Sequence, residues 1–295
     1  MLRIDYKITF ISIVFIAVWL SACPAGSAEV IILGDPKLKP VSDLIAGIEK
    51  TLAYKTTVKL PEDVKNNLEG IVYKEGAKAV VALGKDAVDI SLSLPESIPV
   101  IYGLTIHPLQ TERRNITGIY MATPVEEYIA FIKKYLPGIK KIGIICEPPA
   151  HDSFCPVITL PDVVHYTAAN PYEFIERINL FRNNIDALLL LPQRNLISNK
   201  ALEEVYLFSF KQKIPVIGLS EKYVKIGSLF ALGFDSENMG MQIGNAVKAA
   251  LSRGRADMPS APPEKFNLYI NRKTAETLGI NIPPKLYEQA ERVYP

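Results

Sequence analysis

The stretch covering residues 214–284 holds the densest run of structural signals in the chain. It begins IPVIGLSEKYVKIGSLFALGFDSENMGMQIGNAVKAALSRG at residue 214 and ends FNLYINRKTAETLGINIPP at residue 284. The pattern predicts a buried strand, a polar turn, a second short strand, a turn carrying Asp235, and a long helix over Ser236–Ser252. A crossing segment at Phe266–Ile270 and a last helix at Lys273–Leu278, capped by a glycine, then follow. This order predicts a chain that passes back and forth between two lobes.

Length and charge bound the class of protein. The chain has 295 residues, which suits two α/β lobes of roughly 100–150 residues each. The balance of 33 basic against 31 acidic residues gives no electrostatic case for nucleic acid as a partner. We find no Gly-x-Gly-x-x-Gly, Walker or His-Glu-x-x-His motif, so no cofactor is expected. The three histidines, His107, His151 and His165, are interpreted as structural or surface residues. An enzyme is therefore not predicted.

Residues 1–22 are predicted to be a signal peptide. Basic residues precede the apolar run Ile8–Leu20, which is too short to span a bilayer comfortably. Leu20-Ser21-Ala22-Cys23 looks like a bacterial lipobox, in which the thiol of Cys23 takes the lipid. Ordinary cleavage before Glu29 and an uncleaved anchor are the competing interpretations. Either cleavage exports the protein, so we expect a periplasmic location, with a membrane anchor if Cys23 is lipidated.

Export affects the chemistry that is expected of the other two cysteines. Cys146 and Cys155 form a pair in an oxidising compartment, and we predict a disulfide between them. Two separate free thiols are the alternative. A metal site that uses both thiols and His151 is not favoured, because the spacing matches no common zinc pattern.

The first half of the chain alternates strand and helix. Strands are expected at Val30–Leu33, Thr57–Leu60, Ala79–Leu83 and Pro99–Tyr102, with helices at Val41–Leu52, from Pro61, and at Lys85–Leu92. Alternation at this spacing predicts a parallel sheet with helices on both faces. A first crossing is expected at Ile116–Met121.

The second half repeats the pattern. Helices are expected at Pro124–Leu136, Tyr172–Asn183 and Ser198–Lys211, with strands at Lys141–Cys146, Ala187–Leu191 and Pro215–Gly218. We predict two doubly wound parallel-sheet lobes joined by three crossings. Lobe 1 is assigned residues 30–118 and 234–264, and lobe 2 residues 119–233 and 265–295.

With these elements in place, the chain resembles the ABC-transporter substrate-binding proteins that include tryptophan- and tyrosine-binding members. The resemblance rests on the order of several short motifs: Asn115-Ile116-Thr117-Gly118, Leu136-Pro137-Gly138, Asp186-Ala187, Pro215-Val216, Val224-x-x-Gly227, Gly233-Phe234-Asp235, Gly240 and Asn271-x-x-x-Ala275-x-x-Leu278-Gly279. It covers residues 30–295. It implies the type I periplasmic-binding-protein fold, capture of a small solute between the lobes, delivery to ABC permease subunits, and a monomer.

The resemblance also implies where an amino-acid-like solute would be held. An anion site is expected at Gly84, Lys85 and Thr105. Asp235 is expected either to take an ammonium group or to cap the following helix. Tyr102, Tyr120 and Phe234 would form an aromatic shelf or simply pack. The residues Pro192, Gln193, Ser220 and Glu221 follow strands of lobe 2 and would face the ligand. Ordinary loop polarity is the alternative for Gln193 and Glu221.

One segment and two positions depart from the family pattern. Relatives normally have a helix and a strand where this chain has the short, proline-rich segment between Cys146 and Tyr172, so lobe 2 is expected to have lost most of one helix. Asp35 lies where relatives have a polar segment that touches ligand, and Lys85 lies where they commonly have threonine. Lys85 would favour a more anionic ligand or be a solvated helix start. These departures leave a second hypothesis, a ligand-sensing or partner-docking protein of the same fold without a transport role.

Overall fold

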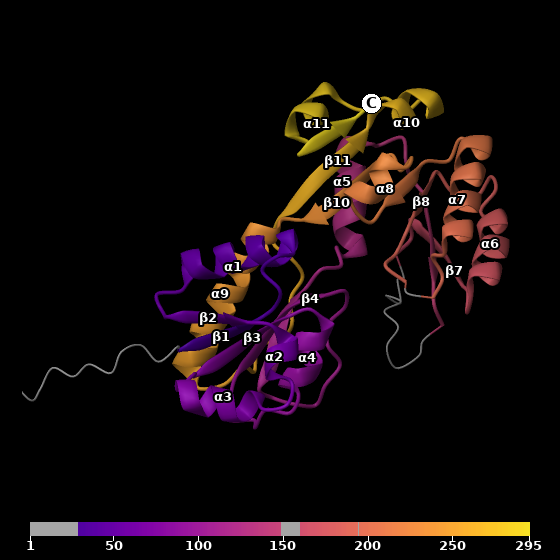
Figure 1. Cartoon of the computed structure of the whole chain (residues 1–295). Helices are drawn as coiled ribbons and strands as arrows, with labels where there is room; N and C mark the ends of the chain where they lie inside the picture. The colour runs from indigo at the N-terminus through magenta and orange to yellow at the C-terminus, as the bar shows by residue number, and fades with distance from the viewer. Residues whose placement is uncertain (1–28, 149–159, 194) are drawn as a thin grey trace, which may run out of the picture.

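The structure is a computed structural model that describes residues 29–148, 160–193 and 195–295. Its two sheets belong to two lobes, seen at the lower left and upper right of Figure 1. The predicted signal peptide, Cys23 and Cys155 lie outside the described residues. Among the described helices, none is long and apolar enough to cross a membrane.

Lobe 1 contains a five-stranded sheet in the order β2-β1-β3-β4-β5, with all pairs parallel. Its strands are β1 (Val30–Leu33), β2 (Thr56–Lys59), β3 (Ala79–Leu83), β4 (Val100–Thr105) and β5 (Ile116–Tyr120). The central strands β1 and β3 are buried along their whole length, because their side chains are apolar on both faces. These two strands lie where the sequence predicted them.

Helices cover both faces of this sheet. They are α1 (Lys39–Thr51), α2 (Pro61–Val64), α3 (Leu68–Glu75), α4 (Lys85–Ser91) and α9 (Ser236–Arg253). Helices α1 and α9 bury one apolar cluster against the sheet, and α2, α3 and α4 bury another on the opposite face. Helix α9 therefore belongs to lobe 1, although it comes late in the chain.

Lobe 2 contains a seven-stranded sheet in the order β12-β11-β10-β9-β8-β6-β7. Its strands are β6 (Ile142–Cys146), β7 (Val163–Thr167), β8 (Ala187–Leu189), β9 (Val216–Gly218), β10 (Phe230–Phe234), β11 (Phe266–Asn271) and β12 (Arg292–Tyr294). Its helices are α5 (Val125–Tyr135), α6 (Pro171–Leu180), α7 (Asn199–Gln212), α8 (Glu221–Lys225), α10 (Arg272–Leu278) and α11 (Pro284–Gln289). Two parallel-sheet lobes are thus confirmed, with one antiparallel pairing, β10 with β11.

The chain passes between the lobes three times. Residues 121–124 lead from β5 to α5, Asp235 joins β10 to α9, and residues 254–265 lead from α9 to β11. The predicted bounds of two crossings were wrong. Of the segment Ile116–Met121 only Met121 lies in a crossing, because the other residues form β5, and Phe266–Ile270 lies within β11. Strand β5 stays in the first sheet to Tyr120, beyond the predicted lobe boundary at residue 118.

Several details of lobe 2 differ from the sequence expectation. Helix α10 ends at Gly279, which has φ 71° as a left-handed cap, but it is not the last element. Helix α11 and strand β12 follow it, and β12 forms the edge of the sheet. Strand β7 forms the other edge, within the segment expected to have lost a helix.

Candidate functional site

Most predicted ligand residues lie at the carboxyl ends of strands. Asp35, Gly84, Thr105 and Tyr120 follow or end β1, β3, β4 and β5 of lobe 1. Because these strands are parallel, the four residues lie along one edge of the first sheet. In lobe 2, Gln193 and Ser220 follow β8 and β9, and Phe234 and Asp235 end and follow β10, all at the corresponding edge.

Gly84 begins α4 with a backbone shape that favours glycine. Its φ is 92°, and an added Cβ would meet no atom within 4 Å. The amide of Gly84 donates to the carbonyl of Gly103 at 2.9 Å, which ties the turn to β4. Lys85 forms an ion pair with Asp89 at 2.6 Å and is 62% exposed, so its charge is largely met within the same helix. At the neighbouring strand end, the Asp35 carboxylate accepts from the amide of Lys37 at 2.9 Å and shapes a turn.

Tyr102 is not available as an aromatic shelf. Its side chain is only 1% exposed within the lobe 1 core. Its hydroxyl donates to Ser260 Oγ at 2.6 Å and accepts from the amide of Leu109 at 3.0 Å. The residue therefore packs, as the alternative interpretation had it, and it fastens the segment after α9 to β4.

Thr105 lies in an irregular part of β4. The register of β4 against β5 shifts between Tyr102 and Thr105, and Leu104 has a φ of 58°. The hydroxyl of Thr105 is buried and has no hydrogen-bond partner among the described residues. Its carbonyl accepts from the amide of Met121 at 2.7 Å. Strained backbone and an unsatisfied hydroxyl are features that cluster at functional sites, so Thr105 stays a candidate.

The two other aromatic candidates lie near the crossings. Tyr120 is half-buried; burial raises the pKa of its hydroxyl, and the neighbouring Tyr102 and Glu126 raise it further. The half-buried ring of Phe234 packs against the lobe 1 cluster, although β10 belongs to the lobe 2 sheet. Phe234 therefore links the two lobes by packing, whereas Tyr120 keeps part of its surface accessible.

Asp235 caps the helix that returns to lobe 1. Its Oδ1 accepts from the amide of Asn238 at 2.9 Å at the start of α9. Within the described residues, no hydrogen bond reaches its other carboxylate oxygen. The capping role is thus present, and it uses one of the two carboxylate oxygens.

Gln193 joins two strands of lobe 2. It is 7% exposed, and its Oε1 accepts from the amide of Glu147 at 3.0 Å. Glu147 in turn accepts from the amide of Asn195 at 2.8 Å. These contacts hold the ends of β6 and β8 together, so Gln193 shapes this edge from within.

Glu221 is engaged with the C-terminal strand. Its carboxylate accepts from the Tyr294 hydroxyl and from Arg292 Nη1, the latter at 2.9 Å. The hydrogen bond from Tyr294, with the charges of Lys225 and Arg292, holds the pKa of Glu221 below its ordinary value. A ligand-facing role for Glu221 is therefore replaced by a structural one. Ser220 begins α8, half-buried, and its side chain makes no capping hydrogen bond.

His107 joins the two lobes, a role that sequence reasoning missed. Its Nε2 lies 3.1 Å from the carbonyl oxygen of Pro192. His107 lies in the loop after β4 and Pro192 in the loop after β8. The contact shows that two loops at the carboxyl edges of the two sheets touch at this point, and it joins residues 85 positions apart in the sequence.

Cys146 ends β6, is fully buried, and is disulfide-bonded. Cys155, its expected partner, lies outside the described residues, so the pairing stays a prediction. No group of three metal-ligating side chains is found in the part of the chain that the structure describes.

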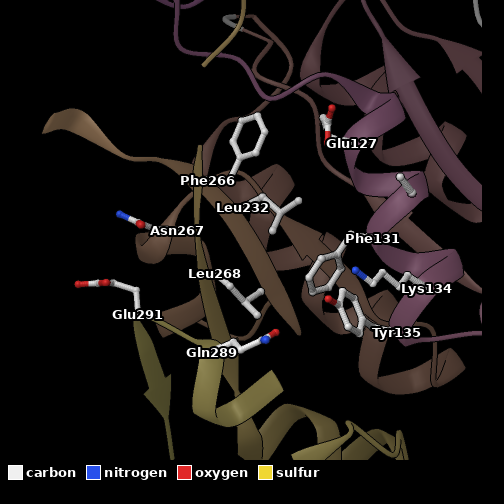
Figure 2. Close-up of a pocket in the computed structure, with 11 residues that line it drawn as sticks. Glu127, Phe131, Lys134, Tyr135, Leu232, Phe266, Asn267, Leu268, Gln289 and Glu291 are labelled. Carbon is white, nitrogen blue, oxygen red and sulfur yellow. The ribbon is translucent and has the colours of Figure 1, made fainter. Parts of the chain in front are cut away.

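Two cavities lie elsewhere in lobe 2. Figure 2 shows the first, of about 390 Å³, between α5 and the strands β10 and β11, with Phe131, Leu232 and Leu268 among its apolar lining. The second, of about 720 Å³, lies where residues 135–139 approach residues 279–283. Neither cavity is lined by any of the predicted ligand residues.

Comparison with known proteins supports the family resemblance. A family model described as ABC transporter substrate binding protein matches residues 43–294. No curated protein matches the sequence.

Solved structures share the fold. A conserved domain protein from Vibrio cholerae is 23% identical, with 90% of this chain and 99% of that chain covered and a TM-score of 0.54. An ABC domain from Streptococcus pneumonia in complex with L-Trp is 19% identical, with 90% and 100% covered and a TM-score of 0.51. A substrate-binding protein with adhesive properties from Clostridium difficile, in a ligand-free, open form, is 16% identical, with 90% and 99% covered and a TM-score of 0.63. The two parallel-sheet lobes have the type I periplasmic-binding-protein fold.

Proposed function

Because the chain belongs to the family of ABC transporter substrate-binding proteins, we propose that it is the exported solute-binding component of an ABC importer. It captures a small solute between its lobes and presents it to permease subunits. Lobe closure about the three crossings is the motion that such capture needs.

The observation that carries this proposal is the meeting of the two carboxyl edges. The bond between His107 and Pro192 brings together the edges on which the predicted ligand residues lie. In open α/β sheets, ligands bind outside the carboxyl ends of the strands. Thr105 and Tyr120 of lobe 1, and Asp235 at the second crossing, retain groups that a solute can use.

These groups suit an amino-acid-like solute. The free carboxylate oxygen of Asp235 is suited to an ammonium group through a charge-assisted hydrogen bond. The buried Thr105 hydroxyl, which has no hydrogen-bond partner among the described residues, can donate to a carboxylate. The half-buried ring of Tyr120 gives an apolar surface. We take aromatic amino acids as the first candidates, because the relative from Streptococcus pneumonia was solved with L-Trp.

Binding to defined solutes tests this proposal. We expect L-tryptophan or L-tyrosine to raise the melting temperature of the mature protein, because a ligand that binds only the folded state stabilises it. Nucleosides and small organic acids serve as comparison solutes. Native mass spectrometry of protein purified without refolding gives an independent reading, as a co-purified solute adds its own mass. Absence of any stabilising or co-purified small molecule would count against solute capture.

Export and anchoring are part of the same proposal. Lipidation at Cys23 would tether the protein by a short link, because β1 starts at Val30. Mass spectrometry of the mature N-terminus separates a lipid-modified Cys23 from a chain that begins at Glu29. A pull-down that recovers permease subunits supports transport, whereas recovery of a sensor kinase alone would favour the sensing hypothesis.

A further inference from the structure

The hydrogen bond between His107 and Pro192 lies outside the three crossing segments. A backbone carbonyl oxygen can only accept, so Nε2 of His107 carries the proton at this 3.1 Å contact. Both residues are half-buried, which partly shields the bond from competing water. The contact therefore fixes the tautomer or charge state of the ring as one with a proton on Nε2.

On the lobe 1 side, the loop that carries His107 is tied to the first crossing. The amide of Met121 donates to the carbonyl of Thr105 at 2.7 Å, and the amide of Ala122 donates to the carbonyl of Ile106 at 3.0 Å. Just before this loop, near the end of β4, Leu104 has a φ of 58°, which is unusual for a bulky side chain. The backbone next to His107 is thus joined by hydrogen bonds to the first crossing.

On the lobe 2 side, Pro192 belongs to a braced edge. The next residue, Gln193, accepts from the amide of Glu147 and so connects the ends of β8 and β6. The acceptor for His107 therefore moves with the lobe 2 sheet and not as a free loop.

We propose that His107 is a positioning residue that holds the two lobes in the arrangement described above. A hydrogen bond is kept only while the distance between donor and acceptor changes by no more than a few tenths of an ångström. Rotation of one lobe about the crossings displaces a contact that lies away from them, so this bond must break or reform as the lobes rotate. Its consequence for solute capture rests on the proposed function, but its effect on lobe arrangement does not.

The test measures lobe arrangement without any solute. Spin labels are placed at Tyr73→Cys on α3 and Leu207→Cys on α7, which are 60% and 63% exposed and lie on different lobes. Pulsed electron resonance then gives the distance distribution between the lobes. We compare His107→Ala with His107→Gln, whose side-chain amide can still donate, and with Gln110→Ala, an exposed residue of the same loop.

We expect His107→Ala to lower the population of the wild-type distance relative to other distances by about two- to tenfold, the range for loss of one net hydrogen bond. His107→Gln should keep much of the wild-type distance distribution. The control Gln110→Ala should give the same distribution as the wild-type protein. A His107→Ala protein that melts earlier but keeps the wild-type distribution would overturn the proposal, since that result assigns His107 a purely local role. So would equal behaviour of the alanine and glutamine variants. Failure of L-tryptophan to bind would contradict the proposed function and leave this distance measurement intact.

Discussion

The carbonyl oxygen of Leu44 on α1 lies against the Cα of Gly240 on α9, so that a Cβ added at Gly240 would meet it at 2.2 Å. The approach is mutual, because a Cβ at Gly47 would meet the carbonyl oxygen of Glu237 at 2.1 Å. Both clashes are with backbone, which cannot rotate away as a side chain can. This close contact between the two helices anchors α9 to lobe 1. It therefore fixes the lobe 1 ends of the second and third connections between the lobes.

Gly240→Ala should consequently destabilise the protein. We expect a loss of about 1–3 kcal/mol in the free energy of unfolding, the usual cost of forcing an extra carbon into a packed contact. Denaturant unfolding measures this change. Gly138→Ala is the matched control, since an added Cβ there meets nothing within 4 Å. Equal losses in the two variants would contradict a specific role for the crossing.

How much of the fold the sequence predicts depends on how much of each element is buried. Strands β1 and β3 were predicted with their observed bounds, because continuous apolar runs between turns leave few other assignments. Strands β7 and β12 were missed. Both are edge strands with half-buried or exposed residues, so their pattern resembles that of a loop.

The candidate site shows a similar limit. Sequence placed its residues at strand ends, because parallel topology follows from the alternation of elements. It gave packing of Tyr102 only as one of two alternatives, and it did not show that Glu221 meets Arg292, 71 positions away. The bond between His107 and Pro192 was missed for the same reason, since such pairings depend on tertiary packing.

Glu221 gives a prediction about pH. Its folded pKa lies below the ordinary value of 4.5, so its stabilising effect is present above that value and is lost as the pH falls through the folded pKa. We expect Glu221→Gln to lower stability near neutral pH by less than about 1 kcal/mol, because the partner Arg292 is exposed. Melting temperatures of the two proteins should converge at acid pH. A constant difference across the whole pH range would contradict the assigned ion pair.

Tyr102→Phe separates packing from ligand contact. The variant keeps the ring in the core and removes the hydroxyl that meets Ser260 and the amide of Leu109. We expect a loss of roughly 1–3 kcal/mol of stability, since the buried amide is left without its partner. The dissociation constant for L-tryptophan, measured by calorimetry, should stay unchanged. A weaker affinity for L-tryptophan with unchanged stability would instead indicate that Tyr102 contacts the ligand.

Asp235 caps α9 and is proposed to bind an ammonium group, and two substitutions can separate these two roles. Asparagine caps helices about as well as aspartate, so Asp235→Asn should keep the hydrogen bond to the amide of Asn238 and nearly all the stability. Its neutral side chain lacks the charge that an ammonium group needs, and we expect L-tryptophan to bind at least about tenfold more weakly. Asp235→Ala removes both the charge and the capping hydrogen bond, so it should also lose about 0.5–2 kcal/mol of stability.

Calorimetry of L-tryptophan binding and denaturant unfolding on the same three proteins give the comparison for Asp235. Affinity should fall in both variants, whereas stability should fall only in the alanine variant, because only that variant loses the cap. Wild-type affinity in Asp235→Asn would restrict Asp235 to capping α9. The ammonium site would then have to be formed by other groups on the meeting edges of the lobes.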